Sequence, residues 1–458
     1  MPKLTSYYLP GLYVEDHSIE VPLDWRGHEP AAVAADGLPA GERIRVFYRT
    51  VCAAENVGRD LPLLVFLQGG PGGAGPRLLS PTSDGWIAEA IKHFRVVLPD
   101  QRGTGRSTHA SARSIARRGD ARAQAEYLKR LLAPSIVRDF EYLRLTEFGG
   151  RAWTTLGQSY GGFLTLCYLS LFPQGIAASF TCGGIPHVPA SAADVYAHTF
   201  PRMVAKTRAY YERYPEDERR MAAIANRLAA GDVTLPDGSP LSVRRLQTLG
   251  GGLGMKPAPE RLHNLLDTAF EAGDSSLACA GAAPELTDGF LMDVLENLTT
   301  AGNPLYWTLQ EFIYADGTMK EPIRWAAEQE YARHPEFADT ARPLMLTGEA
   351  AFPFMFEDDP LLVPLKPAVD LLMEDTEFDP VYDEARLAAN EVPLQAAVYF
   401  DDLYVDSGLQ LDTLSRMGNS HAWVTNQFEH DGLHGSEVFG RLFAEALNRG
   451  DLEHALGA

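Results

Sequence analysis

The chain has 458 residues and a formal net charge of −21, and 45% of its residues are hydrophobic and 22% charged. These proportions are those of a globular protein and exclude a disordered chain, while the acidic balance disfavours binding to nucleic acid or to an anionic membrane surface. The length fits one enlarged domain together with a second domain.

The first 23 residues predict neither a secretory signal nor a membrane anchor. They contain one lysine and early acidic residues, and they lack the apolar core of about 7–15 residues that a signal peptide needs. No run of about 18 apolar residues follows anywhere in the chain. We therefore expect a cytoplasmic protein that makes no membrane contact.

The cysteines are widely scattered and form neither a Cys-X-X-Cys pair nor a cluster with histidine. Such a distribution predicts free, packed thiols in a reducing compartment, without a disulfide framework or a zinc site. The positions are Cys52, Cys167, Cys182 and Cys279.

Short apolar runs that end in glycine-rich turns recur through the first part of the chain. Partial alternation of apolar and polar residues over 16–52 predicts an opening β region. The later runs are continuously apolar, which is typical of strands buried on both faces of a mainly parallel sheet. They occupy 61–67, 94–100, 153–162 (where the strand leads into a turn) and 178–185. Strand, turn and helix repeating in this way predict an α/β fold.

From about residue 190 to 340 the pattern changes to that of helices, and strand-like runs are nearly absent. The strand pattern resumes at 392–402 and 422–426, before a closing helix at about 435–456. We therefore expect a mainly helical cap over 190–365, inserted between the two parts of a catalytic domain, 1–189 and 366–458.

The sequence Gly157-Gln158-Ser159-Tyr160-Gly161 is a complete G-x-S-x-G motif. It follows an apolar strand and precedes a helix, which is the context in which this motif presents a nucleophilic serine above the edge of the sheet. The alternative is a strand-to-helix turn with an ordinary serine. The context favours Ser159 as a nucleophile.

A glycine-rich loop, QGGPGG at 68–73, follows an earlier strand. Acyl transfer needs backbone N–H groups that stabilise the developing oxyanion. One would come from Tyr160, directly after the nucleophile, and the other from this loop. A phosphate-binding loop is excluded because no Gly-Lys-Ser/Thr follows.

A serine nucleophile needs a histidine base that is oriented by a carboxylate, in the chain order Ser, Asp or Glu, His. Candidate acids follow the strand at 392–402, and candidate histidines lie in or after the next strand. The candidates are Asp401, Asp402, Asp406, His421, His430 and His434. The expected order favours Asp402 and His430, because His430 lies in the loop beyond the last strand. Asp401 and His434 remain alternatives.

These motifs together resemble the prolyl aminopeptidases (proline iminopeptidases) of the α/β-hydrolase superfamily. The matching segments are GGPGG at 69–73, DQRGTGRS at 100–107, GQSYGGF at 157–163, YFDDLYVD at 399–406 and WVTNQFEHDGL at 423–433. The resemblance implies an α/β-hydrolase fold with a mostly parallel central sheet and a helical cap. It implies Ser159, Asp402 and His430 as the triad, with Gly70 and Tyr160 as oxyanion donors. Gln68 departs from the family's usual histidine, which affects loop packing more than the oxyanion hole.

An exopeptidase must also recognise a free α-amine, and carboxylates from the cap are the physical means of doing so. Glu311 resembles a glutamate that the family places there, and Glu357, with Glu349 behind it, is a second candidate. For each, the alternative is a solvated surface glutamate. The implied substrates are peptides with a free N-terminal proline, and the implied mechanism needs no metal or organic cofactor.

Two other functions are compatible with parts of this pattern. An esterase or a broader aminopeptidase would use the same triad, and the two differ from a prolyl aminopeptidase only in the cap. A non-catalytic binding protein would lack at least one triad member, whereas this chain has a residue for each. Asp100, Arg102 and Arg106 of DQRGTGRS are predicted to form a structural ion-pair network beneath the glycine-rich loop.

Overall fold

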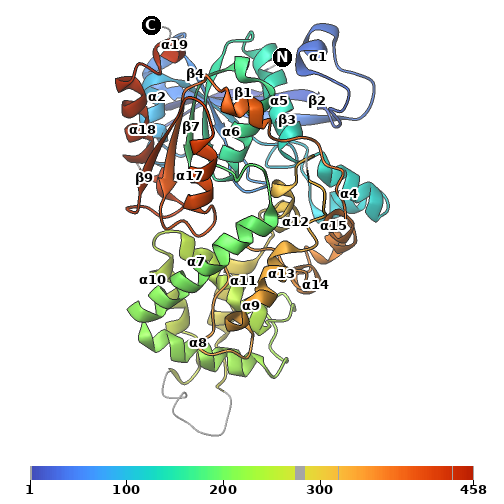
Figure 1. Cartoon of the computed structure of the whole chain (residues 1–458), viewed down its shortest axis with the longest axis vertical. Helices are drawn as coiled ribbons and strands as arrows, with labels where there is room; N and C mark the ends of the chain where they lie inside the picture. Colours follow the sequence, from blue (N-terminus) through green and yellow to red (C-terminus); the bar gives the residue numbers. More distant parts are fainter. Residues whose placement is uncertain (1–2, 274–283, 318, 436, 457–458) are drawn as a thin grey trace.

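The computed structural model describes residues 3–273, 284–317, 319–435 and 437–456. One part of the molecule contains a β-sheet with helices on both sides, and a helical part lies below it in Figure 1. The described residues form a nine-stranded sheet in the order β1-β2-β3-β5-β4-β6-β7-β8-β9. The strands are β1 (Thr5–Leu9), β2 (Leu12–Pro22), β3 (Arg43–Ala53), β4 (Leu63–Leu67), β5 (Arg95–Pro99), β6 (Trp153–Gln158), β7 (Ile176–Cys182), β8 (Leu394–Tyr399) and β9 (Ser420–Thr425).

The strands from β5 to β9 in this order are all parallel, and β1, β2 and β3 add an antiparallel edge beside β5. The expected mostly parallel α/β-hydrolase sheet is therefore confirmed. The opening β region begins earlier than the alternation indicated, because β1 already pairs with β2. A short helix, α1 (Pro30–Asp36), separates β2 from β3 within the segment that was predicted as a β region.

The strand β4 shows why its sequence is apolar throughout. Leu64 and Phe66 pack in a core with α2 (Ile87–His93) and α18 (Glu437–Asn448). Val65 and Leu67 point to the opposite core, which contains α5 (Ala133–Glu147) and α6 (Tyr160–Leu171). Successive side chains of a strand face opposite sides, so a strand covered on both faces has no position left for a polar residue.

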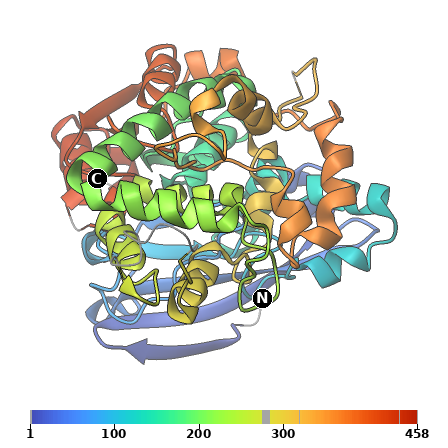
Figure 2. The ribbon, with the colours of Figure 1, turned by 90° about the horizontal axis from the view of Figure 1, so that it is seen from below.

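Helices fill the cap, as expected. They are α7 (Ala192–Arg213), α8 (Pro215–Leu228), α9 (Val243–Gln247), α10 (Ala258–Asp267), α11 (Asp288–Leu298), α12 (Leu305–Leu309), α13 (Ala326–Arg333) and α14 (Met355–Asp358). Figure 2, viewed from the cap end, shows these helices in front of the sheet. The chain returns to the sheet through α15 (Lys366–Met373), which packs against α4 (Ala121–Lys129). The remaining α-helices are α3 (Ala112–Ala116), α16 (Glu384–Ala388), α17 (Ser407–Ser415) and α19 (Glu453–Leu456).

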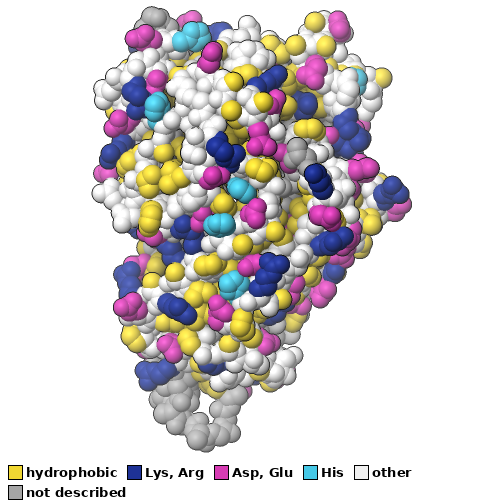
Figure 3. Space-filling model, in the orientation of Figure 1, with side chains coloured by type: hydrophobic (Ala, Val, Ile, Leu, Met, Phe, Trp, Pro, Cys, Tyr) yellow, Lys and Arg dark blue, Asp and Glu magenta, His cyan; other side chains and the backbone are white. Residues whose placement is uncertain are grey.

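On the face seen in Figure 3, acidic, basic and apolar side chains are interspersed over both parts of the molecule. In the described ranges, no helix combines the length and the apolar character needed to cross a bilayer. Three of the cysteines, Cys52, Cys167 and Cys182, are buried free thiols. The fourth, Cys279, lies outside the described residues.

Candidate active site

Ser159 stands at the junction between β6 and α6, in a backbone conformation that non-glycine residues rarely adopt. Its φ is 55° and its ψ is −127°, and such strain is commonly found at functional sites. The flanking glycines allow it: a side chain at Gly161 would collide with the carbonyl of Leu67, and one at Gly162 with the carbonyl of Gly184. The sharp turn leaves Ser159 at the carboxyl edge of the parallel strands.

The glycine-rich loop after β4 passes directly over Ser159. A Cβ atom placed on Gly69 would lie 3.0 Å from the Ser159 Cβ, so only glycine allows this approach. Gly70 has a φ of 125°, which also requires glycine. Tyr160 is the first residue of α6, so its N–H has no acceptor within the helix. The loop that contains Gly70 and the first turn of α6, which begins at Tyr160, therefore both lie next to Ser159.

Asp402 and His430 are both buried and form a direct pair. His430 Nδ1 lies 2.9 Å from Asp402 Oδ2 and 3.1 Å from Asp402 Oδ1. Asp402 Oδ1 also accepts the backbone N–H groups of Tyr404, at 2.8 Å, and Val405, at 3.1 Å. These bonds fix the carboxylate, and donation of the Nδ1 proton to it leaves Nε2 of His430 free to act as a base.

The competing acid and histidines do not join this arrangement. Asp401 is exposed, while its neighbour Asp402 is fully buried. His434 lies in a short 3-10 turn, and its Nδ1 is 3.0 Å from Asp84 Oδ1. His421 lies near the start of β9, the strand end opposite to the loop that carries His430. The geometry therefore favours Asp402 over Asp401 and His430 over His434.

The electrostatic surroundings of His430 favour its protonated form. Burial disfavours the imidazolium, but the charge of Asp402 and its hydrogen bond outweigh this, so the pKa of His430 is raised above its usual value. Within the described residues, no hydrogen bond joins the Ser159 hydroxyl to His430. Such catalytic hydrogen bonds are commonly long in the free enzyme and tighten when substrate is bound.

The cap holds the two loops that carry Asp402 and His430. The backbone N–H of His430 donates to the carbonyl of Gly254 at 3.0 Å, in the 3-10 helix η3 (Thr248–Gly254). From α7, Arg202 donates to Asp406 at 2.5 Å, and Lys206 donates to Glu429 at 2.6 Å. The site is therefore built jointly by the catalytic domain and the cap.

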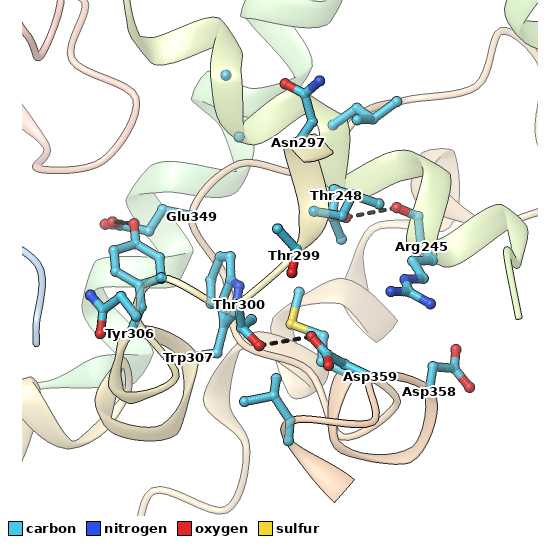
Figure 4. Close-up of a pocket in the computed structure, with 18 of the residues that line it drawn as sticks. Arg245, Thr248, Asn297, Thr299, Thr300, Tyr306, Trp307, Glu349, Asp358 and Asp359 are labelled. Atoms are coloured by element: carbon cyan, nitrogen blue, oxygen red, sulfur yellow. Dashed lines mark hydrogen bonds between the residues drawn. The ribbon is translucent and has the colours of Figure 1, made fainter. Parts of the chain in front are cut away.

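A pocket of about 450 Å³ lies within the cap and adjoins this site. One end is lined by Glu349, Tyr306 and Tyr404. The ring of Tyr404 packs edge-on against His430, with centroids 4.7 Å apart. Figure 4 shows the Tyr306 hydroxyl pointing to the Glu349 carboxylate, and the two form a hydrogen bond. This end of the pocket therefore reaches the Asp402–His430 pair.

Glu349 is a carboxyl group that lies beside the Asp402–His430 pair. Burial raises the pKa of Glu349 above its usual value, and the Tyr306 hydroxyl and the charge of His430 oppose this only in part. Gln310 follows Tyr306 by four residues and so lies on the same helical face. It also lies beside Glu349 and favours its charged form, yet both polar atoms of this fully buried amide lack a hydrogen-bond partner in the described part of the chain. The pocket thus contains a buried carboxylate and a buried amide next to the reacting groups.

From the sequence, Glu349 was a candidate only after Glu357, and Gln310 was not a candidate. Glu349 follows an apolar run, residues 344–346, whose side chains are buried, and this run was the available signal for burial. The spacing of Tyr306 and Gln310 was the corresponding signal for a shared face. Neither signal identifies the neighbour that such a residue meets in three dimensions.

The structure does not place Glu311 in the pocket. Its side chain is fully buried, and its oxygens accept the backbone N–H groups of Ala326, at 2.9 Å, and Ala327, at 3.0 Å. Glu311 therefore caps the N-terminus of α13, a favourable place for a carboxylate. Burial nevertheless raises the pKa of Glu311 to about 8. Its neighbour Gln310 points to Glu349 instead, because adjacent residues on a helix face different directions.

The structure does not place Glu357 in the pocket either. Its side chain is 59% exposed and lies 3.8 Å from Lys366 Nζ. The aromatic side chains around it, which favoured a binding role, belong to the packed interior: Phe352 and Phe356 are buried. The alternative of a solvated surface glutamate therefore describes this residue.

The predicted network of Asp100, Arg102 and Arg106 is wrong in its pairing. Asp100 binds Arg77 at 2.5 Å and accepts the backbone N–H of Gly75, which supports the glycine-rich loop. The two arginines pair with acids from other parts of the chain. Arg102 binds Asp139 and Arg106 binds Asp16, each at 2.5 Å.

Among the residues that the structure describes, no group of three or more His, Cys, Asp and Glu side chains could hold a metal ion. The arrangement that is present consists of a strained serine, an Asp–His pair, backbone donors and a buried carboxylate. This set of groups is suited to acyl transfer through a serine nucleophile.

Comparison with known proteins shows the family to which the chain is related. Residues 62–218 match the family model described as alpha/beta hydrolase fold. The chain is 39% identical over 450 residues to a proline iminopeptidase of Aeromonas sobria, covering 97% of this chain and 98% of the relative. It is 33% identical over 439 residues to a proline iminopeptidase of Aspergillus aculeatus, covering 93% and 94%. A proline iminopeptidase structure from Mycobacterium smegmatis covers 90% of this chain and 97% of that chain, at 16% identity and a TM-score of 0.42.

Proposed function

The chain belongs to the proline iminopeptidase family of α/β-hydrolases, and we propose that it releases an N-terminal proline from peptides through the triad Ser159, Asp402 and His430. The observation that carries this proposal is the buried Asp402–His430 pair, whose Oδ2 and Nδ1 atoms are 2.9 Å apart. Both residues follow strands of the sheet, as does the strained Ser159. The same pair supports a base that is held in one tautomer and one orientation.

The reaction follows from these positions. His430 Nε2 takes the proton of the Ser159 hydroxyl as the oxygen attacks the carbonyl carbon of the N-terminal prolyl residue. The backbone N–H groups of Gly70 and Tyr160 stabilise the negative charge that develops on the carbonyl oxygen. His430 then gives its proton to the leaving amine, and a prolyl ester of Ser159 remains. Water, deprotonated by His430, hydrolyses this ester and releases proline.

Recognition of the free N-terminus is assigned to Glu349 rather than to Glu311 or Glu357. The protonated amine of an N-terminal proline carries two N–H donors and a positive charge. The buried Glu349 carboxylate supplies an opposite charge beside the triad, and the unpartnered Gln310 amide oxygen supplies a second acceptor. A buried charge-assisted hydrogen bond is among the stronger polar interactions, so an acylated N-terminus would bind much less well.

The proposal is tested by hydrolysis of proline p-nitroanilide, N-acetylproline p-nitroanilide and alanine p-nitroanilide, with Ser159→Ala as the control. Turnover of the free proline substrate alone, and only with Ser159 present, is the expected result. Equal turnover of the acetylated substrate would remove the aminopeptidase function and leave an esterase-like hydrolase. Equal turnover of the alanine substrate would indicate a broader aminopeptidase.

A further inference from the structure

The pocket beside the active site contains a buried arginine at the end away from the triad. Arg245, from α9, is 5% exposed and lines this pocket. Its Nη1 donates to the Ser239 hydroxyl at 2.7 Å and to the carbonyl of Pro240 at 2.8 Å. Figure 4 shows its guanidinium on the side of the pocket opposite to Glu349 and Tyr306.

Arg245 differs from the other buried basic residues in having no ion pair. Every other buried lysine or arginine in the described part of the chain forms a salt bridge with a carboxylate. These residues are Arg49, Arg102, Lys129, Arg130, Arg144 and Arg220. Burial of a cation is costly unless an anion compensates it, so the exception requires an explanation.

The hydrogen-bonding capacity of Arg245 is also only partly used. A guanidinium has five N–H donors in a planar fork that fits a carboxylate. The hydrogen bonds of the described residues use only Nη1, and they leave Nε and Nη2 without an acceptor. Both acceptors are neutral oxygens. The carboxylate of Asp237 lies beyond them; it accepts the Ser239 hydroxyl at 2.5 Å and forms no salt bridge with Arg245 in the described part of the chain.

Asp358 and Asp359 line the pocket near Arg245, but neither forms a salt bridge with it in the described part of the chain. Asp359 accepts the Thr300 hydroxyl, at 2.9 Å, and the backbone N–H of Leu361, at 2.8 Å. Asp358 lines the same pocket and forms no salt bridge in the described ranges. Burial raises the pKa of Asp358, and the charge of Arg245 opposes this only in part.

The two ends of the pocket thus carry different groups. The end beside His430 has the Glu349 carboxyl group, and the distal end has the Arg245 guanidinium with Asp358 and Asp359 beside it. The volume of about 450 Å³ falls within the range of roughly 300–1,000 Å³ that is usual for ligand pockets. One prolyl group would fill only part of it, so the distal end is available to a more remote part of the substrate.

We propose that Arg245 binds a carboxylate of the peptide substrate, supplied by the C-terminus of a short peptide or by an acidic side chain. This inference rests on the proposed function, because it takes the N-terminal amine to be held at Glu349. A buried guanidinium with unused N–H donors at the distal end favours short peptides with a free carboxylate over their uncharged amides.

The first test compares free acids and C-terminal amides of Pro-Gly, Pro-Gly-Gly and Pro-Gly-Gly-Gly. For at least one length, kcat/KM of the wild-type enzyme is expected to be about tenfold higher for the acid than for the amide. A ratio near one at every length would exclude the C-terminal carboxylate, and the absence of an advantage for the acidic side chains tested below would then overturn the proposal.

The second test uses Arg245→Gln, with Arg227→Gln as the matched control. Both changes remove one positive charge from the cap, but Arg227 pairs with Asp232 at the surface and does not line the pocket. The acid-to-amide ratio should fall to about one in Arg245→Gln, remain unchanged in Arg227→Gln, and be intermediate in Arg245→Lys, which keeps the charge but not the fork. A ratio that persists in Arg245→Gln would contradict the proposal.

Two further arms identify the source of the carboxylate and separate this inference from the proposed function. Pro-Glu-NH2 and Pro-Gly-Glu-NH2 carry only a side-chain carboxylate, so an Arg245-dependent advantage for them identifies that source.

Binding of Pro-Gly-Gly and its amide to Ser159→Ala, measured by calorimetry, does not depend on turnover. If proline p-nitroanilide is not hydrolysed while the acid still binds about tenfold more tightly, the proposed function fails and the carboxylate site stands. Equal binding of acid and amide, together with no Arg245-dependent advantage for the side-chain carboxylates, overturns the site.

Discussion

In the catalytic domain, Ser159, Asp402 and His430 each follow a strand of the parallel sheet, whereas the carboxylates of the cap lie on short helices and irregular segments. The carboxyl ends of parallel strands meet at one edge, so chain order alone brings the first three together. In the cap, adjacent residues have different surroundings: Gln310 faces Glu349, and Glu311 caps α13. Position along the chain is thus informative where the backbone is a sheet, and much less so where helix packing decides.

The largest expected effect tests the catalytic side of this comparison. Replacing Ser159 with Ala removes the nucleophile, and kcat for proline p-nitroanilide should fall by roughly a millionfold. The thermal unfolding midpoint should not fall, because the change to alanine removes only the hydroxyl group and no packing contact is lost. Substantial residual turnover would show that another residue carries the reaction.

The next largest effect separates two adjacent acids. Asp402→Asn should lower kcat by roughly 10⁴-fold, because the amide no longer holds His430 in the productive tautomer. Asp401→Asn is the matched control, since Asp401 is exposed and should leave kcat within about twofold of the wild type. The opposite ranking of the two variants would show that the strand end positions Asp401, not Asp402, toward the histidine.

The cap is tested by replacing its carboxylates one at a time. Glu349→Gln keeps the shape but removes the charge, so kcat/KM for proline p-nitroanilide should fall by about tenfold to a hundredfold. The Glu349 charge also raises the pKa of His430, which must be neutral to act as a base. The acid limb of the pH–rate profile should therefore move to lower pH in this variant.

Glu357→Gln serves as the control for this change, because Glu357 is exposed and, among the described residues, its one salt-bridge partner is Lys366. Its kinetics and pH profile should match those of the wild type. If Glu357→Gln lowered kcat/KM as much as Glu349→Gln, the N-terminal amine would bind at the surface of the cap, and the assignment of Glu349 would be wrong.

The smallest kinetic effect is expected for Glu311→Gln, which should instead change the dependence of stability on pH. The folded-state pKa of Glu311, about 8, lies above the unfolded value of 4.5. Between these values the folded chain binds the extra proton, so this group lowers the free energy of unfolding as pH rises. The glutamine of the variant does not titrate, so the free energy of unfolding of the variant should not fall in this way. The difference in stability between variant and wild type should therefore shift in favour of the variant as pH rises from 5 to 8.

Thermal unfolding midpoints at pH 5 and pH 8 measure this effect, and proline p-nitroanilide kinetics accompany them. KM is expected to stay within about twofold of the wild-type value, since Glu311 does not line the pocket. A tenfold rise in KM without a change in stability would restore the amine-binding role that the sequence alone indicated for Glu311.

The sequence was sufficient for the parts of the molecule in which one local pattern has one structural meaning. The apolar runs of β4 and β5, and the glycines around Ser159, predicted the parallel sheet and its strained turn. The partners of charged residues were not predictable in this way. Arg102 was expected beside Asp100 but binds Asp139, 37 residues further along the chain, because α5 packs over that loop. Glu349 likewise lies against Tyr306 of α12, and no local pattern in the sequence indicates this neighbour.

The most direct test of the account is the ratio of kcat/KM for proline p-nitroanilide to that for N-acetylproline p-nitroanilide, measured for the wild type and for Glu349→Gln. The account predicts a large ratio in the wild type, which falls by about tenfold or more when the Glu349 charge is removed. A wild-type ratio near one, or a large ratio that Glu349→Gln leaves unchanged, would contradict the claim that the cap selects a free N-terminal amine through Glu349.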